Sequence, residues 1–333
     1  MGASLKDIAK KLNISITTVS WVLSDQGTQK RISKATQDKI WQCAKELNYR
    51  PNLLARGLNT GMTGTIGLIL PSISDSFYSQ VAKAIELEAE NYGYTLMIGS
   101  SESELKRENR IIQMFKSKQI DGLIIAPTKY SEAEIKLLCE ESYPFVLFDR
   151  YFEDMETNYI LINNEECSYE LVHRLILDGN RKIAILLTNP HLKIMEMRLN
   201  GYKRALDEAG IAFDPDLCGI VEFADFEKNI GAVLDNILEK RPDIDSIFFV
   251  THVLAMDTFS HFQKRQINLR DLDMACIHEI PAFHLLVPHM KIAKMPVMEI
   301  GRNAVRILHQ NIVSKREMTP VEKEALVLKC DIP

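Results

Sequence analysis

The sequence lacks the features of membrane-spanning, secreted and disulfide-rich proteins. No apolar run among its 333 residues is long enough for a helix to span a bilayer. The N-terminus lacks the short apolar stretch and small-residue cleavage site of a secretory signal, so we expect a cytoplasmic protein with no membrane partner. The six cysteines are widely scattered and include no C-x-x-C pair, which indicates reduced thiols and argues against a disulfide framework.

The short motifs of common enzymes are also missing. The sequence contains no G-x-G-x-x-G, Walker loop, H-E-x-x-H or G-x-S-x-G. Five of the eight histidines fall between residues 252 and 289, but their spacings match no standard metal motif. We therefore expect no catalytic residue, no metal and no cofactor, and we interpret the chain as a protein other than an enzyme.

The net charge of −5 conceals an uneven distribution of charged residues. Residues 1–60 contain ten Lys and Arg against four Asp and Glu, a net of +6, so the other 273 residues carry −11. A basic segment attached to an acidic one is typical of a module that meets nucleic-acid phosphates on a body that avoids them. The alternative is an ordinary solvated surface. We favour the first interpretation because the basic segment coincides with the helix pair described next.

Residues 5–25, LKDIAKKLNISITTVSWVLSD, show two short helical patterns separated at Asn13. The first has apolar residues at i, i+3, i+4 and i+7 from Leu5, with Ser4 placed to cap its N-terminus. Ser15 is a natural cap for the second pattern, in which Val19 and Val22 face inward. The side chains left facing outward are Ile16, Thr17, Ser20 and Trp21. Two short helices with an exposed polar face predict a helix-turn-helix that reads DNA.

A third helix and a linker follow. Ser33 can cap that helix, and its apolar stripe from Ile40 to Leu47 lets three helices enclose a small core. The stretch RPNLLARGL, residues 50–58, begins a further short helix that cannot be stable alone. NTGMTG, residues 59–64, is the clearest linker in the sequence.

From residue 65 onward, strand-like apolar runs alternate with amphipathic helical patterns. The expected strands are 65–70, 94–99, 121–126, 144–149, 159–162, 182–187, 246–250 and 273–277. The expected helices are 77–92, 104–118, 131–141, 165–179, 198–209, 226–240, 253–266 and 296–314, with a last strand at EALVLK. This alternation predicts an α/β body with parallel sheets covered by helices on both faces.

The segments KDIAKKLNIS, TTVS, ELNYRPN, LAR and TIGLILP, in this order and spacing, resemble the lactose/galactose-repressor family of bacterial transcription regulators. The resemblance covers essentially the whole chain. It implies a helix-turn-helix head at 1–50, a hinge helix and linker at 51–64, and a bilobed body like periplasmic binding proteins at 65–333. The N-lobe would comprise about 65–161 plus 295–320, and the C-lobe about 162–294 plus 321–333.

In that family the second head helix enters the major groove and a hinge leucine wedges into the minor groove. The DNA-binding residues expected here are Ser4, Ser15, Ile16, Thr17, Thr18, Ser20, Trp21, Asn52, Arg56 and Leu58. Trp21 replaces an Arg of most members, and Gly57 interrupts the hinge helix. Two alternatives stay open: the Trp21 ring folds over the head core, or Leu58 packs as a linker leucine against the body.

The resemblance also implies a small-molecule site between the lobes. The effector-binding residues expected there are Phe77, Thr128, Asp149, Arg198, Thr251 and His278. Asp149 could instead simply end a strand, and Arg198 could pair with a surface acid.

The C-lobe half of this site departs from the family. Its Asn-Asp pair is Thr251-His252 here, its Gly-Phe-Asp-Asp is 276–279 (CIHE), and its Thr-Thr-Val-Arg-Gln-Pro is 291–296 (KIAKMP). With His252, His278 or Lys294 in place of acidic or uncharged residues, the cleft should be more positive. We therefore expect an anionic effector, such as a sugar phosphate or sugar acid, bound best while the imidazoles are protonated, below roughly pH 6.5.

Taken with the resemblance, these features predict a sequence-specific DNA-binding regulator, a repressor whose operator affinity is set by a sugar-like effector. The operator should be pseudo-palindromic and the working unit a homodimer. No heptads follow the last helix, so a coiled-coil tetramer is not expected. The alternatives are a solute-binding protein or a sugar-active enzyme with the same bilobed body. The effector, the operator and the direction of the response remain open.

Overall fold

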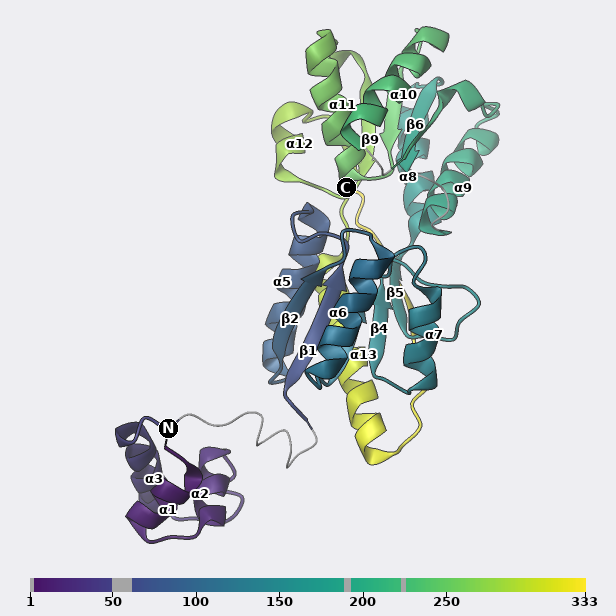
Figure 1. Ribbon diagram of the computed structural model, residues 1–333. Helices are drawn as coiled ribbons and strands as arrows, with labels where there is room; N and C mark the ends of the chain where they lie inside the picture. The colour runs from purple at the N-terminus through teal and green to yellow at the C-terminus, as the bar shows by residue number, and fades with distance from the viewer. Residues whose placement is uncertain (1–2, 50–61, 189–192, 223–225) are drawn as a thin grey trace. The chain divides into compact units, whose positions relative to one another are not determined.

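The structure is a computed structural model that describes residues 3–49, 62–188, 193–222 and 226–333 (Figure 1). Internal contacts divide the chain into two units, residues 1–63 and 64–333. The expected hinge residues Asn52, Arg56 and Leu58 lie outside the described residues, so both interpretations of Leu58 remain predictions.

The head contains three helices, α1 (Leu5–Leu12), α2 (Ile16–Leu23) and α3 (Lys34–Glu46). Helix α1 ends where Asn13 adopts left-handed backbone angles, with φ of 56°. The Ser33 hydroxyl accepts a hydrogen bond from the Thr36 amide at 3.3 Å and so caps α3. The buried core of the head consists of Ile8, Ala9, Val19, Val22, Ile40, Cys43 and Ala44. The predicted apolar stripes therefore do meet in one core.

The N-lobe is built on a six-stranded parallel sheet in the order β11-β5-β4-β3-β1-β2. Its strands are β1 (Thr65–Leu70), β2 (Thr95–Ser100), β3 (Gly122–Ile125), β4 (Phe145–Phe148), β5 (Tyr159–Ile162) and β11 (Ala325–Leu328). Its helices are α5 (Ser76–Asn91), α6 (Leu105–Ser117), α7 (Glu132–Glu140) and α13 (Val297–Glu317). Helices α5 and α13 pack together on one face of the sheet, and α6 and α7 cover the other (Figure 1).

The C-lobe is built on a five-stranded parallel sheet in the order β10-β9-β8-β6-β7. Its strands are β6 (Ile183–Thr188), β7 (Cys218–Val221), β8 (Ser246–Phe249), β9 (Asp273–Ile277) and β10 (Lys291–Ala293). Its helices are α8 (Asn164–Leu177), α9 (Lys193–Glu208), α10 (Phe226–Lys240), α11 (His252–Arg265) and α12 (Pro281–Leu286). No helix in the described ranges is long and apolar enough to cross a membrane.

Three segments connect the lobes: β5 to α8, β10 to α13, and β11 to the C-terminal residues. The last two are joined by an antiparallel bridge, in which Lys294 and Asp331 exchange backbone hydrogen bonds of 2.7 and 3.0 Å. The side chain of Asn163, at the start of α8, accepts a hydrogen bond from the Cys330 amide at 2.9 Å. The connections are therefore tied to one another where the chain passes between the lobes.

The structure corrects several boundaries. The placement of all of 321–333 in the C-lobe is wrong, because β11 pairs with β5 in the N-lobe sheet and the chain crosses only after it. Helix α9 includes residues from Lys193, earlier than the expected start at 198. Three elements were not predicted, namely β7, β10 and α12. Each has six residues or fewer, too few for a periodic pattern to develop.

Candidate functional site

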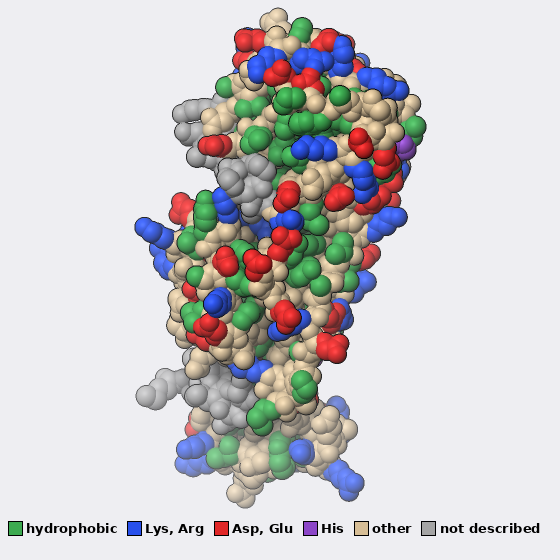
Figure 2. All heavy atoms as spheres, turned by 90° about the vertical axis from the view of Figure 1, so that its right-hand side faces the viewer, with side chains coloured by type: hydrophobic (Ala, Val, Ile, Leu, Met, Phe, Trp, Pro, Cys, Tyr) green, Lys and Arg blue, Asp and Glu red, His purple; other side chains and the backbone are tan. Residues whose placement is uncertain are grey.

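The exposed side of α2 carries most of the head residues expected to contact DNA. Ile16 is 43% exposed and Thr17 is exposed, whereas Thr18 and Ser20 are half-buried. The Ser15 hydroxyl caps α2 by accepting a hydrogen bond from the Thr18 amide at 3.0 Å. In Figure 2, basic side chains prevail on the visible side of the head, while acidic and basic side chains are mixed on the body.

Two of the expected contact residues already have local partners. The Ser4 hydroxyl donates to the Asp7 carboxylate at 2.7 Å, closing the first turn of α1. Trp21 is half-buried, and the Lys30 ammonium lies 5.3 Å from the centre of its ring. The ring is not among the apolar side chains packed against the head core. Trp21 therefore presents an aromatic face with a cation over it.

The body contains a cavity of about 680 Å³ between the carboxyl ends of the strands of its two sheets. Ligands commonly bind in this position in parallel α/β folds, because the loops that follow the strands converge there. The N-lobe wall includes Asp75, Phe77, Tyr78, Asp149 and Arg150, and the C-lobe wall includes Met195, Arg198, Thr251, His252 and His278. Five of the six expected effector residues line this cavity, namely Phe77, Asp149, Arg198, Thr251 and His278.

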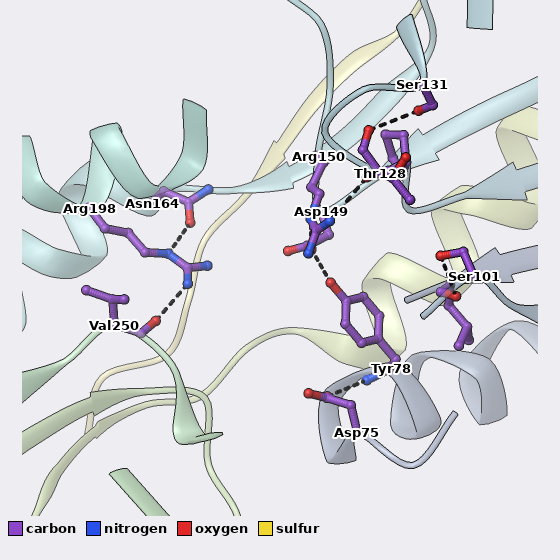
Figure 3. Close-up of polar contacts among 12 residues, drawn as sticks. Asp75, Tyr78, Ser101, Thr128, Ser131, Asp149, Arg150, Asn164, Arg198 and Val250 are labelled. Carbon is purple, nitrogen blue, oxygen red and sulfur yellow. Dashed lines mark hydrogen bonds and ion pairs between the residues drawn. The ribbon is translucent and has the colours of Figure 1, made fainter. Parts of the chain in front are cut away.

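Asp149 is the centre of the polar N-lobe wall (Figure 3). It follows β4 directly and adopts left-handed backbone angles, with φ of 64°. The Tyr78 hydroxyl donates to its Oδ2 at 2.6 Å, and the Nε of Arg150 lies 3.6 Å from the same oxygen. Burial raises the pKa of Tyr78, so the phenol stays protonated and acts as the donor. Asp149 thus has a compensating cation within its own lobe.

Thr128 does not line the cavity, which corrects its expected role in effector contact. The residue is 1% exposed, and its backbone amide donates to the Glu108 carboxylate at 2.8 Å. Its carbonyl oxygen accepts a hydrogen bond from the Ser131 hydroxyl at 3.0 Å. Burial raises the pKa of Glu108. These hydrogen bonds hold the loop that follows β3.

Arg198 extends from α9 into the C-lobe wall and is only 4% exposed. Its Nε donates to the Asn164 side-chain oxygen at 2.8 Å, and its Nη1 donates to the Val250 carbonyl at 2.7 Å. Both partners are neutral. No carboxylate in the part of the chain that the structure describes forms an ion pair with Arg198. In Figure 3 its third nitrogen points away from both partners, toward the N-lobe residues.

Two histidines complete the C-lobe wall. The Nδ1 atoms of His252 and His278 lie 3.0 Å apart, and the His252 Nε2 lies 3.7 Å from the Asp75 carboxylate of the N-lobe. Burial, together with nearby His252 and Arg198, lowers the pKa of His278 to about 3. Burial also lowers the pKa of His252, with Asp75 acting in the opposite direction. Both rings are therefore neutral at pH 7.

The expectation of a cleft made positive by its C-lobe replacements is wrong for these residues. The imidazoles are neutral because burial disfavours the charged ring. Lys294 does not line the cavity, and its ammonium pairs with Glu279 at 3.1 Å on the surface. The cations that do line the cavity are Arg150 and Arg198.

Sequence reasoning missed Asp75, Tyr78 and Arg150. Asp75 caps α5, since its Oδ1 accepts hydrogen bonds from the amides of Phe77 and Tyr78 at 2.8 and 3.2 Å. Their positions in the sequence could have identified these three residues. The segment DSFY places Asp75 and Tyr78 one turn apart at the start of the helix that carries Phe77, and Arg150 directly follows Asp149.

Two family models match the chain. Residues 4–52 match the model described as bacterial regulatory proteins, lacI family. Residues 63–321 match the model described as periplasmic binding proteins and sugar binding domain of LacI family. Together these matches cover the head and nearly all of the body.

Individual proteins are similar over the same length. The ribose operon repressor of Halalkalibacterium halodurans is 30% identical over 315 residues, covering 94% of this chain and 91% of that protein. The transcriptional repressor PurR of Aliivibrio fischeri is 28% identical over 317 residues, covering 94% and 93%. The crystal structure of the lac repressor dimer bound to operator and the anti-inducer ONPF superposes with a TM-score of 0.80. At 18% identity, covering 100% of this chain and 98% of that one, it establishes the shared fold.

Proposed function

Because this chain belongs to the lacI family of bacterial regulatory proteins, we propose that a small anionic sugar derivative in its cavity controls how its head binds an operator. The chain is a DNA-binding transcriptional regulator with an effector-binding body, and its relatives are repressors rather than enzymes. The relatives therefore argue against the solute-binding and sugar-active alternatives. We expect such a regulator to act in the cytoplasm, where its operator DNA lies.

The charge state of Arg198 carries the proposal for the effector. A buried cation is costly unless an opposite charge compensates it. The family's acid after β9 is replaced here by His278, whose ring is neutral, so the guanidinium keeps only neutral partners. A phosphate or carboxylate group of an effector would supply the missing charge, and the planar guanidinium suits two hydrogen bonds to such a group.

The carboxylates around the cavity do not neutralise Arg198, because each is stabilised by other groups or by water. Asp149 lies beside Arg150, and Asp75 accepts the first amides of α5. Glu102 and Glu104 are exposed at the rim, where water screens them. None of the four forms an ion pair with Arg198.

The rest of the wall suits a sugar. Asp149 is positioned to accept hydroxyl protons, while Phe77 and Met195 offer apolar surface to the faces of a sugar ring. The volume of about 680 Å³ accommodates a monosaccharide derivative with a charged substituent. We propose a sugar phosphate or a sugar acid, bound with its charged group at Arg198 and its hydroxyls toward Asp149.

The proposed working unit is a homodimer that presents two heads to a pseudo-palindromic operator. Exposed apolar side chains support a self-association surface on one flank of the body, where Figure 1 shows β2, α5 and α12. Ile98 on the edge strand β2 is 47% exposed, and Leu285 on α12 is 85% exposed. Large apolar side chains exposed in this way are candidates for burial in an interface. We propose that the head, the hinge and the body keep separate roles, with the hinge at about 51–64.

The effector class is tested by thermal shift of the full chain with matched probe pairs. The pairs are D-ribose 5-phosphate with D-ribose, and D-gluconate with D-glucose. The charged member should raise the midpoint more, because a ligand that binds only the folded state stabilises it by RT ln(1 + [L]/Kd). The Arg198→Gln variant should lose this difference, while the surface variant Arg270→Gln should keep it. Equal shifts from neutral and charged members would contradict the proposal.

DNA binding is tested by gel retardation with the DNA upstream of the chain's own gene. The full chain should retard this DNA, and its affinity should fall steeply as salt increases, because basic residues displace counterions from phosphate. A chain lacking residues 1–60 should not retard DNA, yet should keep the thermal midpoint of the body. A truncated body that still binds the DNA would refute the role of the head.

A further inference from the structure

The rings of His252 and His278 in the cavity wall are joined by one hydrogen bond. Their Nδ1 atoms lie 3.0 Å apart, a hydrogen-bond distance. A neutral imidazole protonates one of its two nitrogens, so one ring must donate through Nδ1 and the other must accept there. The direction of this bond decides what the opposite nitrogen of each ring, Nε2, can do.

Asp75 favours one direction. Its Oδ2 lies 3.7 Å from the His252 Nε2, while its Oδ1 is occupied by the amides at the start of α5. The distance is slightly longer than a hydrogen bond, but a carboxylate so close attracts an N–H and repels a lone pair. His252 should therefore be protonated at Nε2, which leaves its Nδ1 as the acceptor of the shared bond.

The surroundings of His278 favour the same direction. If His252 accepts at Nδ1, His278 donates through its own Nδ1 and carries a lone pair at Nε2. That Nε2 is buried and has no hydrogen-bond partner among the described residues. A buried N–H without a partner is rarer than a buried acceptor without one. The nearby Arg198 cation also opposes a second positive dipole end on this ring.

We infer that Asp75 and His252 are positioning residues that fix His278 as a hydrogen-bond acceptor on the wall of the cavity. The chain of contacts crosses between the lobes, because Asp75 belongs to the N-lobe and both histidines belong to the C-lobe. The Phe77 ring of the N-lobe packs edge-on against the His278 ring with a centroid distance of 5.5 Å. This contact fixes the orientation of the imidazole.

A ring with a lone pair at Nε2 accepts a hydrogen bond from a hydroxyl or an N–H, and it cannot donate to a phosphate or carboxylate oxygen. Resting on the proposed function, this leaves the charged group of the effector to Arg198, because His278 offers that group no donor.

Nitrogen NMR of the histidine rings tests the inference without any ligand, so its outcome is separate from that of the probe experiments. The full chain is labelled with ¹⁵N-histidine, and ring signals are assigned from their loss in His278→Gln and His252→Gln. In the unsubstituted protein at pH 7, His278 should show a protonated Nδ1 and an unprotonated Nε2. His252 should show the reverse.

The Asp75→Asn variant should reverse the direction of the bond. Asn still caps α5 through its oxygen, while its amide group takes the place of Oδ2 and donates to the His252 Nε2. The proton pattern of both rings should then exchange, so that His278 becomes protonated at Nε2. As a matched control, Asp235→Asn removes the carboxylate 2.9 Å from His261 and should shift only the signals of that ring.

Two results would overturn the inference. One is a protonated Nε2 on His278 in the unsubstituted protein, which stands whether or not the variants fold. The other is an Asp75→Asn protein with an unchanged thermal midpoint and unchanged His278 signals. Exchange of the two nitrogen types in Asp75→Asn, together with an unaffected His278 in Asp235→Asn, would support it.

Discussion

The substitution His278→Asp tests whether Arg198 lacks a counter-ion in the ligand-free protein. Arg198 is 4% exposed and is held only by Asn164 and the Val250 carbonyl. His278 is close enough for that cation to lower its pKa. A carboxylate at this position would therefore meet an uncompensated guanidinium. We expect the ligand-free variant to be more stable than the unsubstituted protein at pH 7.

The size of this gain in stability follows from one favourable effect and two opposing ones. Two opposite charges about 4 Å apart attract by about 4 kcal/mol at an effective dielectric constant of 20. Desolvation of the new carboxylate opposes this by a few kcal/mol, reduced because the cavity admits water. Loss of the bond between the two histidines costs about 1 kcal/mol. The net gain should be about 1 kcal/mol, which raises the thermal midpoint of a body of this size by roughly 2–4 °C.

The same carboxylate should weaken anionic ligands, because it occupies the charge that they would meet. D-ribose 5-phosphate should bind at least about tenfold more weakly, a loss of about 1.4 kcal/mol. Pairing with Arg198 lowers the folded-state pKa of the new carboxyl group below its unfolded value. Its added stability is therefore present above about pH 4 and disappears as the pH falls through the lowered pKa.

The assay is thermal and denaturant unfolding at pH 7, with and without the probe, and again near pH 3. The matched control is His289→Asp, which adds the same charge at an exposed position and should change stability by less than about 0.5 kcal/mol. A His278→Asp protein that is less stable than the unsubstituted one, with the sugar phosphate stabilising both equally, would refute the reasoning about Arg198.

Three further predictions concern the head and the histidines. Ser15→Ala removes the acceptor of the Thr18 amide and should cost about 1 kcal/mol of head stability, seen as faster amide exchange in α2 but not in α9. Trp21→Arg should change the preferred base in each half-site of selected DNA without unfolding the head, because the ring lies outside its packed core; an unfolded head would place the ring in the core. Since the folded-state pKa of His278 is about 3, below the usual 6.5, the unfolded chain binds more protons between these values. The unfolding free energy should rise with pH through that window, and effector affinity should be flat from pH 7 to 8; an affinity that falls across pH 7 to 8 would mean a charged ring.

The regular elements of the body could be predicted because their patterns are long and local. Strands such as Thr65–Leu70 and helices such as Phe226–Lys240 repeat apolar residues over enough positions to show their period. Strand β10 has three residues, and no period can be recognised over that length. The sequence assigns β11 to the wrong lobe for another reason. It depends on where the chain crosses between the lobes, which is a property of the whole topology.

The candidate site was predictable where it depends on positions at strand ends. Asp149 and His278 follow strands directly, and the resemblance to a family assigned the loops that carry them. The partners could not be predicted, because they come together only in the folded body. Nothing in the local sequence of Tyr78 indicates that its hydroxyl donates to Asp149 at 2.6 Å. The neutrality of His278 could not be predicted either, because it results from burial, whereas the sequence alone predicts an imidazole that binds best when protonated.

Where the family resemblance implies an acid, this chain has His278. This difference links effector chemistry to the stability of the ligand-free protein. An acid at this position would compensate Arg198 permanently, and an anionic ligand would then meet an ion pair instead of a cation. Histidine leaves the guanidinium uncompensated, while burial, helped by His252 and by that same guanidinium, lowers the pKa of His278 and keeps its ring neutral. The two residues therefore cannot be altered independently. A change at either one should shift both the stability of the ligand-free body and the charge preferred in the effector.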